Sequence, residues 1–401
     1  MVFLHLSDLH LGKRMNGYSL IEDQRFFLFD VVLKECEKRG VRLILIAGDV
    51  YDVASPSAEA TTLFSDFLDA LSRANIQAIL IPGNHDSAER LHYASSFLKR
   101  EGIHVIATLE EAMHPIEIEG VSFYGIPFSR ASDFRDVLGE DCPESLAERF
   151  KAFLGKLDID QDKTNVLLLH AAVSTSESVL LSGSETTYIG TSQILPSSLF
   201  GAFDYVALGH IHKSYPPSPK SFYAGSPLKY HVDEAKEKKS LTFVHVEGKE
   251  ITRESVPFAP LRDLVLEEGT FEELLNHHNE KDFVAVNLLD GVLVKNARDR
   301  LQKSSFPYLV SLHNEIRREN GAIPQAQARK NVSLHEDFAQ FYETIQGKPL
   351  PPLMERIVLE AEEAAKKEEC PWLPCAYRCP PSGHTPPSSR SISRGSIPPC
   401  S

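Results

Sequence analysis

The segment AILIPGNHDS, residues 78–87, joins an apolar run to a cluster of polar side chains, Asn84, His85 and Asp86. None of these three residue types is a good strand former. Polar side chains directly after a buried strand are typical of a site at the carboxyl end of a sheet strand. The segment therefore predicts an α/β sheet that carries chemistry at one edge.

Apolar runs of strand length recur through the first 255 residues. They are VFLHL (2–6), LILIA (43–47), AILI (78–81), VSFYGI (121–126), NVLLLH (165–170), YVALGH (205–210) and LTFVHV (241–246). Amphipathic stretches over 26–39 and 58–74 have helical periodicity. Nearly continuous apolar strands that alternate with such helices predict an α/β layered sandwich, with β-sheets flanked by helices.

Five of these strands end in side chains that commonly bind metals: Asp8 and His10, Asp49, Asn84, His170, and His210 with His212. Because the carboxyl ends of strands converge in such a sheet, we expect one shared site. Imidazole and carboxylate ligands without thiolate are typical of hydrolytic manganese, iron or zinc sites. Seven ligands are too many for one ion, so the set predicts two, with Asp49 as the bridge.

A single histidine at a strand end is usually a hydrogen-bonded structural residue. We assign that role to His5, His92, His104, His114, His231 and His245. The same explanation fails for the ligand set, because five separate strand ends would have to coincide. Asp52 and Asp86 are intermediate, and we expect them to orient a ligand or a catalytic histidine.

The pattern changes after residue 255. Residues 1–255 form the first predicted domain, and residues 256–328 a small α+β domain with strands over 283–289 and 308–312. Residues 329–369 contain two amphipathic helices, which either pack on their own domain or dock a partner. Residues 370–401 are read as a disordered or non-native tail, and Cys370, Cys375 and Cys379 in it do not have the spacing of a common zinc site.

Composition narrows the class of protein. A length of 401 residues predicts more than one domain. The net charge of −14 argues against binding nucleic acid by bulk charge alone. The scattered cysteines of the body give no disulfide framework. No apolar run approaches the ~20 residues of a membrane span, and the first residues read as a strand, so we expect a cytoplasmic protein without a membrane partner.

The motifs DLH, GDVYD, GNHD, a single histidine after an apolar strand, and GHIH follow one another in the order of the calcineurin-like metallophosphoesterase superfamily, which the chain resembles. LHLSDLHLGK, LIAGDVYD, IPGNHDS, ALGHIHK and YAGSPLKY resemble its SbcD branch of DNA repair nucleases. The resemblance covers roughly residues 1–365 and not the tail.

The resemblance implies a division of the ligands between the two ions. Asp8, His10, Asp49 and His212 would hold one, and Asp49, Asn84, His170 and His210 the other. His85 would stabilise the transition state or protonate the leaving group. The implied metal is Mn²⁺.

The resemblance also implies a manganese-dependent DNA nuclease, with double-strand exonuclease, single-strand endonuclease and hairpin-opening activity. Residues 256–328 would be its capping domain, and 329–369 would dock an SbcC-like ABC-type ATPase. A homodimer within a heterotetramer is implied, and an apolar patch near 51–67 is its predicted interface. Lys13 and Arg14 would meet DNA or form a solvated loop, and the loop 174–191 would line the substrate channel.

Two other functions stay open on the sequence. A phosphatase or small-molecule phosphodiesterase would share every metal motif. A metal-free scaffold on the same fold is the second alternative, and such proteins typically lose ligands, whereas this sequence keeps all seven and His85.

Overall fold

The computed structural model describes residues 1–175, 194–314, 338–339, 342, 349–352 and 354–359. The chain divides into two compact units, residues 1–318 and 319–401. The four-part division predicted from the sequence stays a prediction. The tail 370–401, residues 315–328, most of 329–369 and most of the loop 174–191 lie outside the described residues.

The secondary structure of the first unit is as follows. The strands are β1 (Val2–Leu6), β2 (Arg14–Met15), β3 (Tyr18–Ser19), β4 (Leu43–Ala47), β5 (Gln77–Ile81), β6 (Ile103–Val105), β7 (Ile116–Ile118), β8 (Val121–Ile126), β9 (Thr164–His170), β10 (Val173–Ser174), β11 (Leu195–Pro196), β12 (Tyr205–Gly209), β13 (Tyr215–Ser218), β14 (Ser221–Tyr223), β15 (Ser240–Glu247), β16 (Glu250–Pro257), β17 (Leu264–Gly269), β18 (Phe283–Leu288) and β19 (Leu309–Asn314). The helices are α1 (Ile21–Phe26), the π-helix η1 (Phe27–Leu33), α2 (Lys34–Arg39), α3 (Ala58–Arg73), α4 (Ala88–His92), α5 (Ser95–Leu98), α6 (Leu109–Ala112), α7 (Ala131–Leu138), α8 (Leu146–Leu154), α9 (Phe271–Leu275) and α10 (Ala297–Ser304), with 3₁₀ turns η2 (Lys99–Glu101), η4 (Ser197–Phe200) and η5 (Val232–Lys236).

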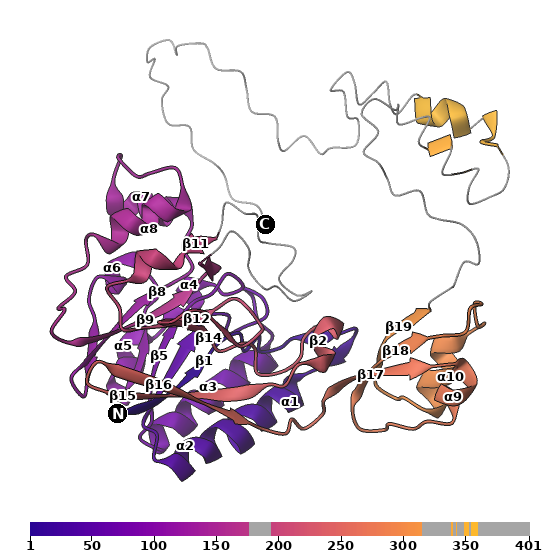
Figure 1. Cartoon of the computed structure of the whole chain (residues 1–401), viewed down its shortest axis with the longest axis horizontal. Coiled ribbons are helices and arrows are strands. Elements are labelled where there is room, and N and C mark those ends of the chain that lie inside the picture. The colour runs from indigo at the N-terminus through magenta and orange to yellow at the C-terminus, as the bar shows by residue number, and fades with distance from the viewer. Residues whose placement is uncertain (176–193, 315–337, 340–341, 343–348, 353, 360–401) are drawn as a thin grey trace, which may run out of the picture. The chain divides into compact units, whose positions relative to one another are not determined.

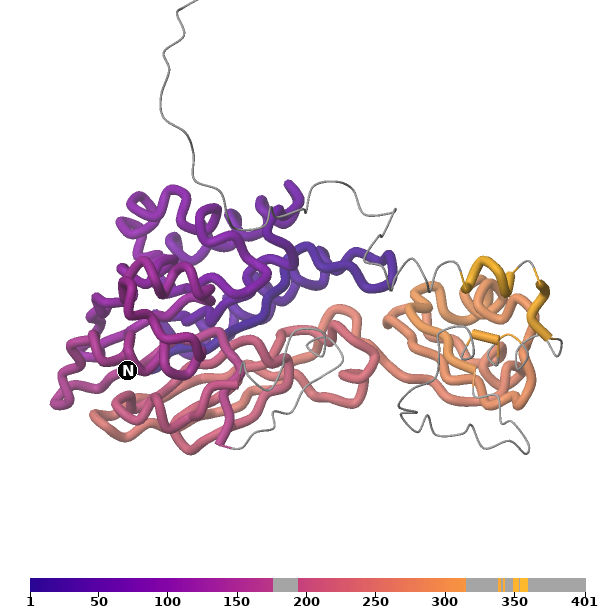
Figure 2. The backbone as a smooth tube through the Cα atoms, turned by 90° about the horizontal axis from the view of Figure 1, so that it is seen from above, coloured from indigo at the N-terminus to yellow at the C-terminus, as the bar shows by residue number. Residues whose placement is uncertain are grey.

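Two six-stranded sheets form the body, in the orders β16-β15-β1-β4-β5-β6 and β13-β14-β12-β9-β8-β7. Strands β1, β4, β5 and β6 of the first sheet and β8, β9, β12 and β14 of the second pair in parallel, and antiparallel strands complete the edges at β16, β13 and β7. The antiparallel pairing of β15 with β1 returns residues 240–247 to the amino-terminal strand (Figure 2).

Alternation of side chains along the strands explains the layers. Leu43 and Leu45 of β4 belong to the core that contains the second sheet, whereas Ile44 and Ile46 belong to the core that contains the α3 side chains. A strand whose two faces are both buried has to be apolar throughout, as LILIA is. The predicted α/β sandwich is confirmed, with helices α1–α3 below and α6–α8 above the sheets in Figure 1.

The helix expected over 26–39 begins earlier, at Ile21, and contains the π-helical stretch η1. Residues 58–73 form α3, which begins at the N-cap Ser57, whose side chain accepts a hydrogen bond from the Ala60 amide. Leu63, Phe67 and Leu71 of α3 are buried, as their spacing predicts.

The expected α+β domain is a parallel β-α-β-α-β arrangement, and is therefore α/β. Strands β17, β18 and β19 pair in parallel, with α9 and α10 between them in sequence. Val284 and Val286 face the core shared with α9 and α10, whereas Phe283 and Ala285 face a core shared with Met15, Leu20 and Tyr230 of the body. The prediction missed β17 because its sequence, LVLEEG, carries two glutamates on an edge strand.

Most of the large apolar side chains in the patch predicted near 51–67 are buried and do not form an exposed interface. Tyr51, Leu63, Phe64 and Phe67 are all buried in the body, since they form the inner face of α3 and its preceding loop. Val53 is the large apolar side chain of this range that is exposed (53%), and more exposed ones lie at Tyr93 (82%) and Phe97 (68%). Within the described part of the chain, no helix is long and apolar enough to cross a membrane.

Candidate metal centre

The predicted ligands lie in loops at the carboxyl ends of five strands. Asp8 and His10 follow β1, Asp49 follows β4, Asn84 follows β5, His170 ends β9, and His210 and His212 follow β12. β1, β4 and β5 belong to one sheet and β9 and β12 to the other, so the site lies where the ends of two sheets meet. All seven residues are brought together, as the following contacts establish.

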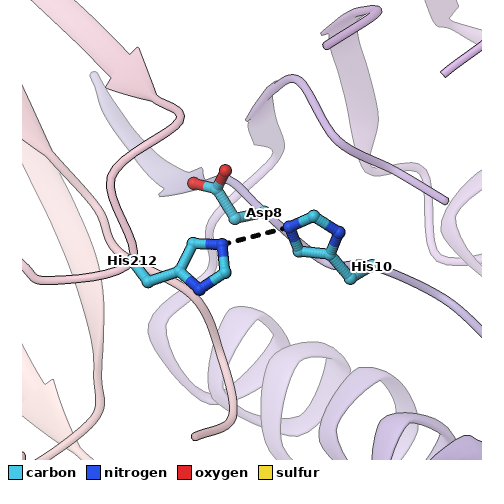
Figure 3. Close-up of side chains that lie close together, drawn as sticks. All are labelled: Asp8, His10 and His212. Carbon is cyan, nitrogen blue, oxygen red and sulfur yellow. Dashed lines mark hydrogen bonds between the residues drawn. The ribbon is translucent and has the colours of Figure 1, made fainter. Parts of the chain in front are cut away.

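The first cluster is formed by Asp8, His10 and His212, all of them buried (Figure 3). His10 Nε2 lies 3.1 Å from His212 Nε2. Two imidazole nitrogens that face each other across this distance need a proton or a cation between them, because their lone pairs repel. The donor set therefore fits a bound cation.

The second cluster is formed around the side-chain oxygen of Asn84. Its Oδ1 lies 3.0 Å from His170 Nε2 and 3.0 Å from His210 Nδ1. Asp8 also contributes here, because its carboxylate accepts a hydrogen bond of 2.9 Å from the His210 amide and groups with Asp49 and His170.

Asp49 lies between the two clusters. Its Oδ2 is 3.6 Å from His10 Nε2 and 3.3 Å from His170 Nε2. Its other oxygen, Oδ1, accepts a hydrogen bond of 2.9 Å from the backbone amide of His85. One carboxylate thus faces ligands from both clusters, which is the arrangement expected of a bridge.

Hydrogen bonds from outside the clusters orient two of the histidines. His170 Nδ1 lies 2.8 Å from the Ala47 carbonyl oxygen, and His212 Nδ1 lies 3.4 Å from Glu234 Oε1. Donation from Nδ1 leaves Nε2 as the ligand nitrogen, the usual pattern of metal-binding histidines. In both residues Nε2 is the atom that faces a cluster.

The electrostatics of the second cluster keep Asp49 ionised. Burial opposes ionisation, but His170 and His10 hold the pKa of Asp49 well below its usual range. Burial likewise disfavours a charged His170, yet the Asp49 carboxylate outweighs it and raises the pKa of His170 to about 9. Burial and the neighbouring His170 lower the pKa of His210 to about 4. A cation at this point would take over the role of the His170 proton.

Two glycines permit the close approach of the ligand loops. A Cβ at Gly83 would lie 2.1 Å from Asp49 Oδ1, and one at Gly209 would lie 1.9 Å from the Ala47 carbonyl oxygen. Atoms cannot approach so closely, so only glycine fits before Asn84 and before His210. This gives a physical reason for the glycine that opens the GNHD and GHIH motifs.

His85 lies beside the first cluster and outside both ligand sets. Its ring centroid is 4.8 Å from that of His10. His85 Nδ1 lies 2.8 Å from the backbone oxygen of Asp52, a contact that fixes the orientation of the ring. The backbone oxygen of Asp52, rather than its carboxylate, is thus the group that contacts the predicted catalytic histidine.

Asp52 and Asp86 contact the ligand loops from outside. The Asp52 carboxylate is 3.5 Å from His10 Nδ1 and 2.7 Å from Lys13 Nζ. Asp86 accepts backbone hydrogen bonds of 2.9–3.0 Å from Val50, Tyr51 and Gly83 and so ties two ligand loops together. Lys13 is paired with Asp52, and its predicted contact with DNA stays a prediction.

Sequence reasoning missed Glu234, Lys239 and Tyr230. Tyr230 is buried, with its ring 5.5 Å from that of His10 and 5.7 Å from that of His212. Glu234 and Lys239 fall in VDEAKEKKS, a charged stretch that resembles a solvated surface, so no sequence signal marks them. The histidines assigned structural roles belong to no metal cluster of the described residues.

A cavity of about 620 Å³ opens beside the second cluster. Asn84, Asp86, Phe128 and Arg130 are among the residues that line it. It offers space for a substrate next to the ligands and places one guanidinium at its wall.

Comparison with known proteins agrees with this geometry. Residues 1–214 match the calcineurin-like phosphoesterase family. The chain is 30% identical over 351 residues to the SbcD component of nuclease SbcCD from Staphylococcus epidermidis, over 84% of this chain and 92% of that protein.

Two solved structures are more distant. A dimetal phosphatase from Danio rerio is 11% identical and covers 65% of this chain and 99% of its own, with a TM-score of 0.40. The protein TT1561 of Thermus thermophilus is 13% identical and covers 63% and 98%, with a TM-score of 0.36. These scores are too low to bear on function. On the family match and the identity to the staphylococcal protein, the chain belongs to the calcineurin-like phosphoesterase family and to its SbcD-type branch.

Proposed function

We propose that this protein is a phosphodiester hydrolase that cuts DNA with two divalent ions, and that Mn²⁺ is the metal. Asp8, His10, Asp49 and His212 would hold one ion, and Asp49, Asn84, His170 and His210 the other. The observation that carries the proposal is the position of Asp49 Oδ2, 3.6 Å from a ligand of one set and 3.3 Å from a ligand of the other. A single-ion site has no need of a carboxylate placed in this way.

The residues of the chain suggest how the reaction proceeds. When bound, a pair of divalent ions supplies an activated water and neutralises charge on the phosphate. His85 is held by its Nδ1 at the Asp52 carbonyl, so Nε2 is the atom we assign to the leaving oxygen. Donation of the Nε2 proton to that oxygen as the P–O bond breaks would avoid release of an alkoxide.

DNA is proposed as the substrate on two grounds. The staphylococcal relative is named a nuclease, and the alignment spans 92% of it. The chain also carries the module β17–β19 beyond the catalytic body, and enzymes for small substrates rarely need one. Exonuclease, endonuclease and hairpin-opening activity, and a role in DNA repair and recombination, are parts of the same proposal.

An SbcC-like ABC-type ATPase is the proposed partner, since the relative is named as a component of SbcCD. In the second unit, residues 354–359 are helical. Met354 (44% exposed) and Ile357 (55%), three residues apart and so on one face, give this helix exposed apolar side chains. A coiled coil of the partner would bury them.

A homodimer is also proposed, with a different interface from the one the sequence indicated. Tyr93 lies between the short helices α4 and α5, and Phe97 lies in α5. Both side chains are largely exposed. Exposed aromatic side chains so close together favour an interface with a second copy.

The test is cleavage of a labelled DNA duplex and a hairpin in Mn²⁺, with a phosphomonoester and a cyclic nucleotide alongside. We expect the wild type to cut DNA. His85→Gln should bind Mn²⁺ equally well and cut ~10²–10⁴-fold more slowly, the range lost with a general acid. His245→Gln, a control whose histidine pairs with Glu254 on β16, away from the clusters and from the cavity, should cut like the wild type.

Turnover of only the small substrates would contradict the nuclease proposal and favour a phosphatase or small-molecule phosphodiesterase. Absence of Mn²⁺ binding by the wild type would contradict the metal centre itself and favour the scaffold alternative.

A further inference from the structure

Glu234 is a carboxylate in an unusual place. Among the described residues it is the glutamate whose side chain is fully buried. It lies in the short 3₁₀ turn η5, outside the metal motifs. Burial of an ionised carboxylate costs several kcal/mol unless it is paired and hydrogen-bonded. We therefore looked for the groups that pair with Glu234.

The two oxygens of Glu234 have different neighbours. Oε1 lies 3.4 Å from Nδ1 of His212, a predicted ligand. Oε2 lies 2.7 Å from Lys239 Nζ and accepts a hydrogen bond of 3.4 Å from Ser226 Oγ. The carboxylate therefore joins the metal centre to a buried cation.

Lys239 holds the same histidine from its other side. Its Nζ donates hydrogen bonds of 3.0 Å to the His212 backbone oxygen and 3.0 Å to Ser226 Oγ. The Ser226 amide donates to that same backbone oxygen at 3.0 Å. The backbone of His212 is thus fixed by Lys239 and Ser226, and its ring by Glu234.

We propose that Glu234, paired with Lys239, is a positioning residue that fixes the tautomer and orientation of His212. An acceptor at Nδ1 keeps the proton there, which leaves the Nε2 lone pair directed at the first cluster, 3.1 Å from His10 Nε2. Removal of such an orienting partner typically lowers metal affinity ~10–100-fold. The inference rests on the proposed metal centre and adds a residue that its motifs do not contain.

The test compares Glu234→Gln with Glu237→Gln on the full chain. Glu237 also contacts Lys239, at 3.1 Å, but the structure places it on no metal ligand, so it is the matched control. Mn²⁺ affinity is measured by titration. The tautomer of His212 is read from long-range nitrogen–proton NMR spectra of the imidazole rings of metal-free protein, a readout that general loss of stability does not move.

We expect Glu234→Gln to bind Mn²⁺ ~10–100-fold more weakly, with the His212 proton shared between Nδ1 and Nε2, and Glu237→Gln to match the wild type. If Glu234→Gln does not fold, the double variant Glu234→Met with Lys239→Met removes both charges together, a change that buried pairs often tolerate. The same loss of affinity is expected of it.

A folded variant without the Glu234 carboxylate that binds Mn²⁺ like the wild type, with the proton still on Nδ1, would overturn the inference and leave the proposed function standing. Failure of the wild type to bind Mn²⁺ would overturn both. The two failures are therefore distinguishable.

Discussion

Four of the proposed ligands have backbone conformations that residues other than glycine rarely adopt. The φ angles of Asp8, His10, Asp49 and His210 are 53°, 44°, 49° and 97°. Each such residue costs about 1–3 kcal/mol, which the surrounding structure has to offset. Their concentration at one site is a mark of function, because a structural histidine or aspartate has no need of this strain.

His5 is a buried histidine that the proposed chemistry does not use. Its Nδ1 lies 3.0 Å from the Tyr205 hydroxyl, on the facing sheet. Burial lowers the pKa of His5 from 6.5 to about 3. Between these values the unfolded chain binds more protons than the folded one, so stability is lost as the pH falls below about 6.5.

We therefore predict that His5→Asn, which cannot titrate, loses less stability on acidification than the wild type. The difference should be on the order of 2 kcal/mol between about pH 7 and about pH 5, at 1.36 kcal/mol per pKa unit. Urea unfolding in EDTA measures it, since EDTA removes the separate pH dependence of metal binding. Parallel loss of stability in the two proteins would contradict the assignment.

Among the elements, the loops after β4 and β5 have to pack against each other to form the site. We predict that Gly83→Ala weakens Mn²⁺ binding by about tenfold or more, because its Cβ would displace Asp49, whose Oδ1 lies 2.1 Å away. Titration of Mn²⁺ measures the effect. Gly155→Ala is the control, since its Cβ would meet nothing closer than 3.4 Å. Equal affinities in the two variants would show that the loops do not need this approach.

The sequence predicted elements well where both faces are buried and poorly where they are not. β4 and β9 are continuous apolar runs, and the structure confirms both. β16 reads EITRESVP and alternates between half-buried and exposed residues at a sheet edge, so its composition resembles a loop. The pattern of apolar residues in the sequence cannot reveal such an edge strand, because β16 is defined by its pairing with β15.

Prediction of the site shows the same limit. The seven ligands follow strands directly, so their motifs placed them together. Glu234 and the Ala47 carbonyl reach their histidines only through tertiary structure. The position of a backbone oxygen cannot be predicted from residue types, and a glutamate among lysines is typical of a solvent-exposed segment.

At the scale of the whole molecule, the module of β17–β19 is attached through a buried ion pair. Arg262 contacts Asp23 of α1 at 2.6 Å, and the two side chains are 14% and 1% exposed. The guanidinium also lies over the rings of Phe283 and Tyr308. Asn16 and Tyr18, just after the first ligand loop, donate to backbone oxygens of Val310 and Pro307.

We predict that Arg262→Ala loosens the module, because removal of one partner of a buried pair costs about 3–5 kcal/mol. Hydrogen exchange should rise in β17–β19 and stay unchanged in β4 and β5. Arg25→Ala, which breaks an exposed pair with Asp66, should change stability by at most about 1 kcal/mol. Unchanged exchange in β18 and β19 would mean that Arg262 does not hold the module.

In the proposed metal centre, Asp49 joins two metal ions in one site. The most direct measurement is a Mn²⁺ titration of the wild type and Asp49→Asn followed by electron paramagnetic resonance. We expect two Mn²⁺ per wild-type chain with the spectrum of a spin-coupled pair, and in Asp49→Asn the loss of that coupling and of at least one ion. A single uncoupled Mn²⁺ in the wild type, or coupling that survives in Asp49→Asn, would contradict this arrangement.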